Sequence, residues 1–183
     1  GLAWGGIYLI AVGAQPGGTY TIWDTVQGFH SHFQNDRSTA TDIPNFVPGT
    51  LTAVSWGPDA TYIAIGDSNG NLRLLSDVAC SCWGYEKGIH DHQQQINSIA
   101  WSTDNKTVAT ASDDGTIHLW NVIRPHMVAG QSDAQYYHKT KITPGTIFTN
   151  PDNRKVTAVV WSPDSKFLLS GDEAGNIYSW VVK

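Results

Sequence analysis

The sequence predicts an all-β repeat protein built from four similar units. In every unit a first marker residue is followed 19 positions later by a second, and the four pairs are Trp4 and Trp23, Trp56 and Leu75, Trp101 and Trp120, and Trp161 and Trp180. Short apolar runs accompany these markers, and turn residues separate the runs. Self-similarity at a fixed spacing is typical of repeat architectures.

The first apolar run of each unit ends at the first marker. The four runs read GLAW, LTAVSW, INSIAW and VTAVVW. In the third unit, residues 96–101 place Ile96 and Ala100 on one side of a strand and Ile99 and Trp101 on the other. Apolar residues on both sides predict a strand that is buried on both faces or nearly so.

Two further runs complete a three-stranded antiparallel core in each unit. In the third unit, turn residues 102–105 lead to a second run at 107–112. Asp113, Asp114 and Gly115 then turn into a third run at 116–120. The corresponding runs elsewhere are YLIAVG and TYTIW, TYIAIG and NLRLL, and FLLSG and NIYSW.

A fourth strand is predicted most clearly in the second unit, at residues 82–88. Each unit then forms a small four-stranded sheet, and stacking the sheets face to face buries what one sheet alone would expose. We expect one domain over 1–183, with units at approximately 1–35, 50–89, 95–150 and 155–183. The last unit stops after its third strand, so one strand is missing from the count.

The repeats resemble the WD40-repeat propeller family. Asp91 and His92 stand where the family has a Gly-His pair, TASDDGTIHLW fills residues 110–120, and Asn121 replaces the Asp of the Trp-Asp dipeptide. Trp23 and Asp24 keep that dipeptide intact. The resemblance implies a β-propeller of four-stranded antiparallel WD-type blades, with four blades present as a partial ring or as half of a dimeric ring.

The resemblance also implies a buried hydrogen-bonded tetrad in the third unit. The matching residues are His92, Ser112, Asp114 and Trp120. The family's turn Asp lies six residues before the second marker, where the four units have Gly17, Asn69, Asp114 and Ala174. The full set is therefore expected in the third unit alone.

A hydrolase triad is the enzymatic alternative for the same histidine, serine and aspartate. The family's tetrad lies inside the blade, where a substrate carbonyl could not approach. We therefore expect a structural network, no catalytic residues and no enzyme activity, and a buried carboxylate kept tolerable by hydrogen bonds.

No metal site or cofactor is predicted. His30 with His32, and His90 with His92, have the spacing that places two side chains on one strand face. Zinc would need two further ligands, so a solvated or hydrogen-bonded surface role is expected for these pairs. Cys80 and Cys82 alternate along a strand and are expected to be reduced thiols.

Two surfaces are candidates for partner binding. Insertions at about 25–49 and 122–155 carry aromatic and charged residues, although some of these aromatics could instead pack as fourth strands. The family adds a rim around the central channel. Carried onto this chain, the rim comprises Thr50, Thr52, Ser68, Gln95, Asn97, Asp113, Lys155, Thr157 and Glu173.

The net charge of −5, with 11 Lys and Arg, supplies no basic stripe for nucleic acid. The apolar opening segment falls in register with the other strands, so it is expected to form strands rather than a signal peptide, and no membrane partner is expected. The lack of a targeting signal and the two cysteines lead us to expect a cytoplasmic location. The single Met127 and the start at Gly1 favour a fragment of a larger ring over two chains that close one ring.

The predicted function is a non-catalytic scaffold that binds proteins or peptides. The alternative is a regulatory propeller of a larger enzyme, such as a kinase or a nucleotide-binding signalling protein.

Overall fold

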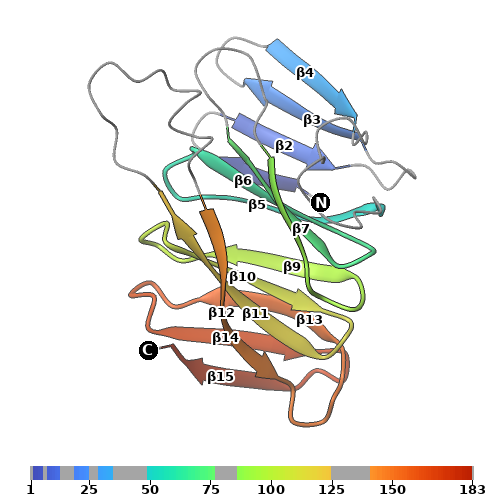
Figure 1. Ribbon diagram of the computed structural model, residues 1–183, viewed down its shortest axis with the longest axis vertical. Coiled ribbons are helices and arrows are strands. Elements are labelled where there is room, and N and C mark those ends of the chain that lie inside the picture. The colour runs from blue at the N-terminus through green and yellow to red at the C-terminus, as the bar shows by residue number, and fades with distance from the viewer. Residues whose placement is uncertain are drawn as a thin grey trace.

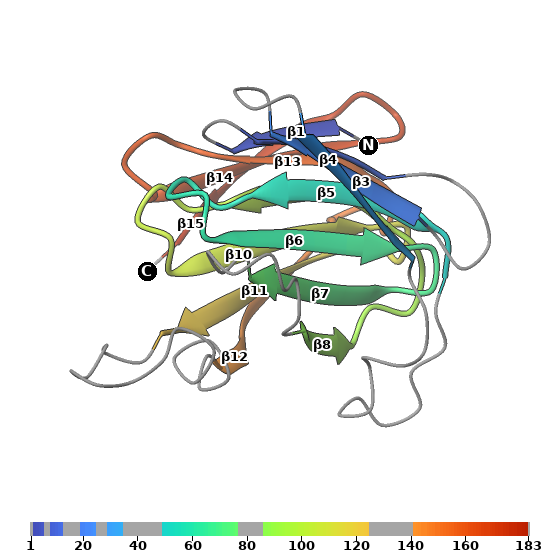
Figure 2. The same cartoon turned by 90° about the horizontal axis from the view of Figure 1, so that it is seen from above.

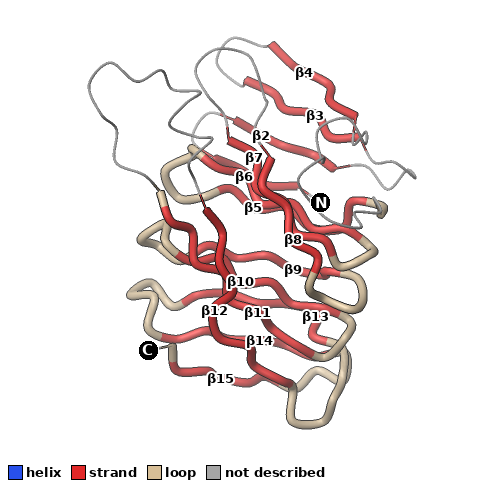
Figure 3. Tube along the Cα trace, viewed as in Figure 1, coloured by secondary structure: helices blue, strands red, loops and turns tan. Residues whose placement is uncertain are grey.

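The strands form a stack of antiparallel sheets (Figure 1). The computed structural model describes residues 2–5, 8–12, 19–24, 29–34, 49–76, 86–124 and 141–182. Only strands, turns and loops occur in these residues (Figure 3). No helix among them is long and apolar enough to cross a bilayer. The all-β propeller class is confirmed.

Each sheet runs in chain order from its first strand outward. The first sheet holds β1 (Leu2–Gly5), β2 (Tyr8–Val12), β3 (Thr19–Asp24) and β4 (Phe29–Gln34). The second holds β5 (Leu51–Trp56), β6 (Tyr62–Asp67), β7 (Asn71–Ser76) and β8 (Glu86–His90). The third holds β9 (Ile96–Trp101), β10 (Thr107–Ser112), β11 (Thr116–Ile123) and β12 (Lys141–Thr149).

The fourth sheet has three strands in the described residues, β13 (Val156–Trp161), β14 (Phe167–Asp172) and β15 (Ile177–Val181). The apolar runs thus became strands close to their expected bounds. The fourth strand of the second sheet is described over Glu86–His90, and the expected start at 82 lies outside the described residues.

The first strands β5, β9 and β13 lie side by side along one side of the stack, and the fourth strands β8 and β12 lie on the opposite side (Figure 2). The marker tryptophans at the ends of the first strands form hydrogen bonds to the neighbouring first strands. Trp101 donates its indole N–H to the carbonyl of Ser55 at 3.2 Å, and Trp161 donates to Ala100 at 3.1 Å. Tryptophan at this position therefore holds the third sheet to the second and the fourth sheet to the third.

Apolar side chains fill the space between sheets. Tyr62, Leu72 and Leu74 of the second sheet pack against Ile96 and Trp101 of the third. The same arrangement recurs between the third and fourth sheets, where the buried residues include Ala109, Ala111, Ile117, Leu119, Val156, Val159 and Leu168. Fully buried side chains of this size supply the main stabilising term of the fold.

The other face of the fourth sheet is open. Val160, Phe167, Leu169, Ile177 and Val181 are between 43% and 77% exposed. Cross-strand pairing places them on one face, because Val160 pairs with Leu169 and Phe167 pairs with Val181. Large exposed apolar patches are uncommon on soluble monomers.

Candidate functional site

A buried hydrogen-bond network ties the strands of the third sheet together. His92 precedes β9, and its Nδ1 lies 2.9 Å from Oδ2 of Asp114 in the β10–β11 turn. Its Nε2 lies 2.7 Å from the hydroxyl of Thr110 on β10. Trp120 on β11 donates its indole N–H to that same hydroxyl at 2.9 Å. One hydroxyl therefore links the imidazole and the indole.

The expected hydroxyl, Ser112, was the wrong residue. Its Oγ instead donates to the carbonyl of Gln94 and accepts the N–H of Asp114, both at 3.2 Å. Trp120 pairs directly with Val108, so its indole reaches Thr110, the next residue on the same face. Such diagonal neighbours are about 7 to 8 Å apart. Ser112 lies one step further and is out of reach.

Asp114 is well satisfied as a carboxylate. Besides His92, it accepts the N–H of Gln93 at 2.9 Å and the N–H of Thr116 at 2.9 Å. Burial alone would raise the pKa of Asp114, but hydrogen bonds from His92, Thr116 and Gln93 outweigh burial and hold the pKa well below its usual value. The carboxylate is thus charged wherever the protein is folded near neutral pH.

The geometry does not suit acyl transfer. His92 and Thr110 are both fully buried, and the hydroxyl already accepts from Trp120. Ser112, the nucleophile of the hydrolase alternative, bonds to the main chain rather than to His92. A nucleophile needs a neighbouring base and an open approach for the substrate. The arrangement can hold the strands together, but it leaves no open approach for a substrate.

The second and fourth sheets hold the same turn with a different carboxylate. Asp67 ends β6, where β10 has Ser112, and it accepts the N–H of Asn69 at 2.9 Å and the side-chain amide of Asn71 at 2.7 Å. Asp172 ends β14 and accepts the side-chain amide of Asn176 at 3.0 Å. The glycines of the three turns share a positive φ of 80° to 83°. In both turns the carboxylate lies two residues before the position at which the family has its turn Asp.

Sequence reasoning missed Asp67 and Asp172, although a signal was present. Both turns read Asp-x-x-Gly-Asn, whereas the third unit reads Ser-Asp-Asp-Gly-Thr. The signal for Thr110 was also present. A hydroxyl stands ten residues before Trp120 and before Trp180, where Ser170 accepts the indole N–H at 2.9 Å. The second sheet has Ile65 and Leu75 at these positions, so the polar pair is replaced as a unit.

Four of the predicted rim residues form one network at the junction of the third and fourth sheets. Gln95 donates to Asn97 at 2.9 Å, and Asn97 donates to Asp113 at 2.7 Å. Lys155 donates its Nζ to the other oxygen of Asp113 at 2.9 Å. Asn97 also reaches the carbonyl of Val156 at 2.9 Å, which joins the two sheets.

The charged pair of this network is accessible. The side chain of Lys155 is 47% exposed and that of Asp113 is 22% exposed. Burial would raise the pKa of Asp113, but hydrogen bonds from Asn97 and Lys155 lower it overall. The hydrogen bond to Asp113 raises the pKa of Lys155, and Glu173 adds to this effect. The rim thus presents a fixed ion pair to solvent.

The remaining rim residues sit at the same ends of the strands but outside this network. Thr52 donates to the carbonyl of Ile96 at 2.6 Å, which ties the second sheet to the third. Thr157 donates to Gly171 at 3.1 Å. Ser68 accepts the N–H of Thr50 at 3.0 Å. Their part in partner binding stays a prediction.

The predicted absence of a metal site also stays a prediction. Among the residues that the structure describes, no group of three or more His, Cys, Asp or Glu is arranged to hold a metal ion. His92 is engaged by Asp114 and Thr110. The side chains of His30 and His32, and both cysteines, lie outside the described residues.

Comparison with known proteins agrees with this architecture. Residues 84–121 and 143–180 match the family model described as WD domain, G-beta repeat. Each match spans a fourth strand and the three strands that follow it. The chain is a WD40-repeat protein. The resemblance seen in the sequence is therefore confirmed.

The WD40 chain is similar to parts of longer relatives. It is 32% identical over 142 residues to actin-interacting protein 1 of Drosophila melanogaster, which covers 74% of this chain and 19% of the relative. It is 28% identical over 136 residues to an uncharacterized WD repeat-containing protein of Schizosaccharomyces pombe, covering 72% and 19%. The chain thus spans about a fifth of the length of these two relatives.

A solved structure shares the fold of the WD40 chain. A chain in the crystal structure of the mitotic checkpoint complex superposes with a TM-score of 0.67 at 17% identity. The superposition covers 98% of this chain and 45% of that one. At this identity the likeness speaks for the fold alone.

Proposed function

We propose that this WD40 chain is a non-catalytic interaction scaffold that binds partner proteins or peptides at the rim around Asp113 and Lys155. The observation that carries the proposal is the exposed ion pair, held in place by Asn97 and Gln95 across two sheets. Conformationally fixed polar groups bind with little loss of freedom. The buried network beneath the rim supplies rigidity rather than chemistry.

A matched pair of charge reversals tests the rim. Lys155→Glu places like charges beside Asp113 and Glu173, while Lys166→Glu reverses a lysine at the other ends of the strands, where its side chain is 74% exposed. Partners captured by the wild-type chain from a lysate of its source organism are quantified for both variants. The proposal expects partners that Lys155→Glu loses and Lys166→Glu keeps. Equal capture by all three proteins would refute the rim.

Filamentous actin is the first defined partner to test. Two similar proteins carry actin in their names, actin-interacting protein 1 of Drosophila melanogaster and subunit 1A of the actin-related protein 2/3 complex of Arabidopsis thaliana. We include actin binding in the proposal on this ground. Co-sedimentation with filaments should pull down the wild type and leave more Lys155→Glu in the supernatant. No co-sedimentation of the wild type would remove actin and leave the rim proposal intact.

The alternative of a regulatory propeller in a kinase or nucleotide-binding enzyme gains no support from the matched family or from the named relatives.

We further propose that the open face of the fourth sheet is covered in the assembled protein, because Phe167 and Ile177 are too exposed for a stable free surface. Light scattering gives the solution mass. A clean dimer would assign the cover to a second copy, and a monomer that binds an apolar dye would assign it to other blades of a longer chain.

A further inference from the structure

Arg124 bridges the second and third sheets at the ends of the strands remote from the rim. It follows β11, and its Nη1 donates to Oδ2 of Asp59 and, at 3.3 Å, to the hydroxyl of Thr61. The guanidinium carbon lies 4.6 Å from the centre of the Tyr62 ring. An ion pair on one side and an aromatic face on the other fix the position of the guanidinium.

The other half of the guanidinium is not used. Nε and Nη2 of Arg124 are buried and have no hydrogen-bond partner in the part of the chain that the structure describes. These two N–H groups form the side-on fork that matches the two oxygens of a carboxylate. Buried donors without acceptors are costly, so a fork left in this state indicates an acceptor that comes from elsewhere.

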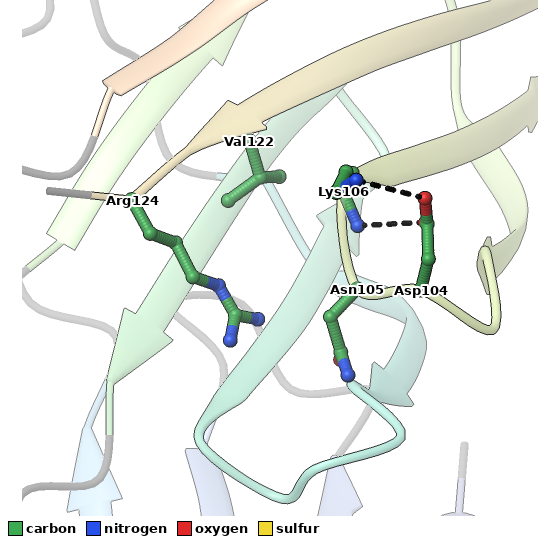
Figure 4. A pocket seen from close by; sticks show the side chains of 5 residues that line it. All are labelled: Asp104, Asn105, Lys106, Val122 and Arg124. Carbon is green, nitrogen blue, oxygen red and sulfur yellow. Dashed lines mark hydrogen bonds and ion pairs between the residues drawn. The ribbon is translucent and has the colours of Figure 1, made fainter. Parts of the chain in front are cut away.

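A cavity of about 320 Å³ adjoins Arg124. Its lining consists of Asp104, Asn105, Lys106, Val122 and Arg124, and the guanidinium points into the space in front of the Asp104–Lys106 turn (Figure 4). This volume is at the lower end of the range for ligand pockets, about 300 to 1,000 Å³. It is large enough to admit an Asp or Glu side chain.

The charges around the cavity favour a single negative charge. Asp59 already pairs with Arg124, and Asp104 lies 3.8 Å from Lys106. The Lys106 side chain is 78% exposed, and an exposed pair of this length contributes little, so the ammonium is free to turn to a ligand. Arg124 and Lys106 together balance Asp59 and Asp104, so one carboxylate adds less uncompensated negative charge than a dianionic phosphate would.

We propose that this cavity binds an Asp or Glu side chain of a partner polypeptide, with its carboxylate on Nε and Nη2 of Arg124 and Lys106 as the second cation. The site is separate from the rim, because the turn holding Lys106 and the turn holding Asp113 lie at opposite ends of β10. A partner that occupies both would run across the edge of the third sheet. Failure of this proposal would leave the rim proposal standing.

The test reads the Arg124 fork directly by NMR on protein labelled with ¹⁵N-arginine and ¹⁵N-lysine. The probe is the peptide acetyl-Gly-Glu-Gly-amide, and the matched control contains Gln in place of Glu. We expect the Glu peptide to shift the Nε–H signal of Arg124 downfield in a saturable way and to leave the Nε–H signal of Arg154 unmoved. The Gln peptide should move neither.

Two variants sharpen the test, with the backbone amide of Lys106 as reporter. Arg124→Lys keeps the charge but loses the fork, so affinity for the Glu peptide should fall by about tenfold or more. Arg154→Lys is the matched control and should leave the affinity unchanged. A silent Arg124 signal, an equal response to the Gln peptide, or tighter binding of the corresponding phosphoserine peptide would overturn the proposal. The wild-type signals decide it even if Arg124→Lys fails to fold.

Discussion

The second and third sheets stabilise the same kind of turn with different residues. Both must hold the tight turn between their second and third strands. In the third sheet Asp114 lies within the turn and is joined to His92, whereas in the second sheet Asp67 lies at the end of β6 and is joined to Asn71. The turn glycines have the same φ in both. The comparison shows that a carboxylate can hold this turn from more than one sequence position.

The largest effect is expected from Asp67→Ala. Asp67 accepts N–H groups from Gly49, Asn69 and Asn71 and also the Asn71 side-chain amide, and it is 1% exposed. Loss of these four bonds, three of them buried and one partly buried, should lower the free energy of unfolding by about 4 kcal/mol, or about 1 kcal/mol for each donor. Urea unfolding measures the change.

Two reference variants serve as comparisons for the unfolding of Asp67→Ala. Asp114→Ala should cost about 1.5 to 3 kcal/mol, the range for hydrogen bonds to a charged group. Asp152→Ala removes an exposed carboxylate whose ion pair with Arg154 spans 3.7 Å, and it should leave the unfolding midpoint unchanged. If Asp67→Ala resembled Asp152→Ala, the carboxylate at the end of β6 would have no structural role.

The next effect compares two hydroxyls. Thr110 serves both His92 and Trp120, whereas Ser170 serves Trp180. Thr110→Val leaves two buried nitrogens unpaired and should cost about 2 to 3 kcal/mol, while Ser170→Ala should cost about 1 kcal/mol. Thermal and urea unfolding of the two variants measure the difference. Equal costs would mean that His92 contributes nothing through Thr110.

A smaller effect concerns the replacement of the polar pair as a unit. The double variant Thr110→Val with Trp120→Leu imitates Ile65 and Leu75 of the second sheet. Because the single changes remove the same hydrogen bond, the double variant should be about 1 kcal/mol less destabilised than the sum of the single variants. A double-mutant cycle gives this coupling. Strict additivity would show that the two positions act independently.

The smallest effect is the pH dependence that His118 of the third sheet contributes. Burial, followed by the nearby His92, lowers the pKa of His118 from 6.5. The unfolded chain then binds the proton more readily, so stability is lost as pH falls from 6.5 toward the lowered pKa. A second loss follows below pH 4, where the unfolded form of Asp114 takes up a proton and its lowered folded pKa resists it.

Replacement of His118 isolates the first of these losses. In His118→Gln the stability should be flat between pH 7 and pH 5, while the loss below pH 4 remains. Urea unfolding at a series of pH values makes the comparison. A wild-type profile that is already flat between pH 7 and pH 5 would contradict the assignment.

Much of the fold follows from the sequence because spacing and turn chemistry are local. The strands at 96–101 and 107–112 have the predicted bounds. The alternation of faces along one strand does not decide between Thr110 and Ser112, because residues two apart share a face and either could serve. It is decided by cross-strand register, which pairs Trp120 with Val108.

The candidate binding site was also predicted only in part from the sequence. Residues before β9 and β13 and in the β10–β11 turn were expected at one end of the stack, which is where Gln95, Asp113 and Lys155 lie. Their hydrogen bonds depend on the distance between sheets and could not be read from one repeat. The Arg124 cavity was missed for the same reason, since Arg124 and Asp59 come from different sheets.

The most direct test of the account is the exchange rate of the Trp120 indole N–H, measured by NMR in the wild type, Thr110→Val and Ser112→Ala. We expect slow exchange in the wild type and in Ser112→Ala, and fast exchange in Thr110→Val, with the Trp161 indole slow in all three because it donates to Ala100. Fast exchange in Ser112→Ala with slow exchange in Thr110→Val would contradict it.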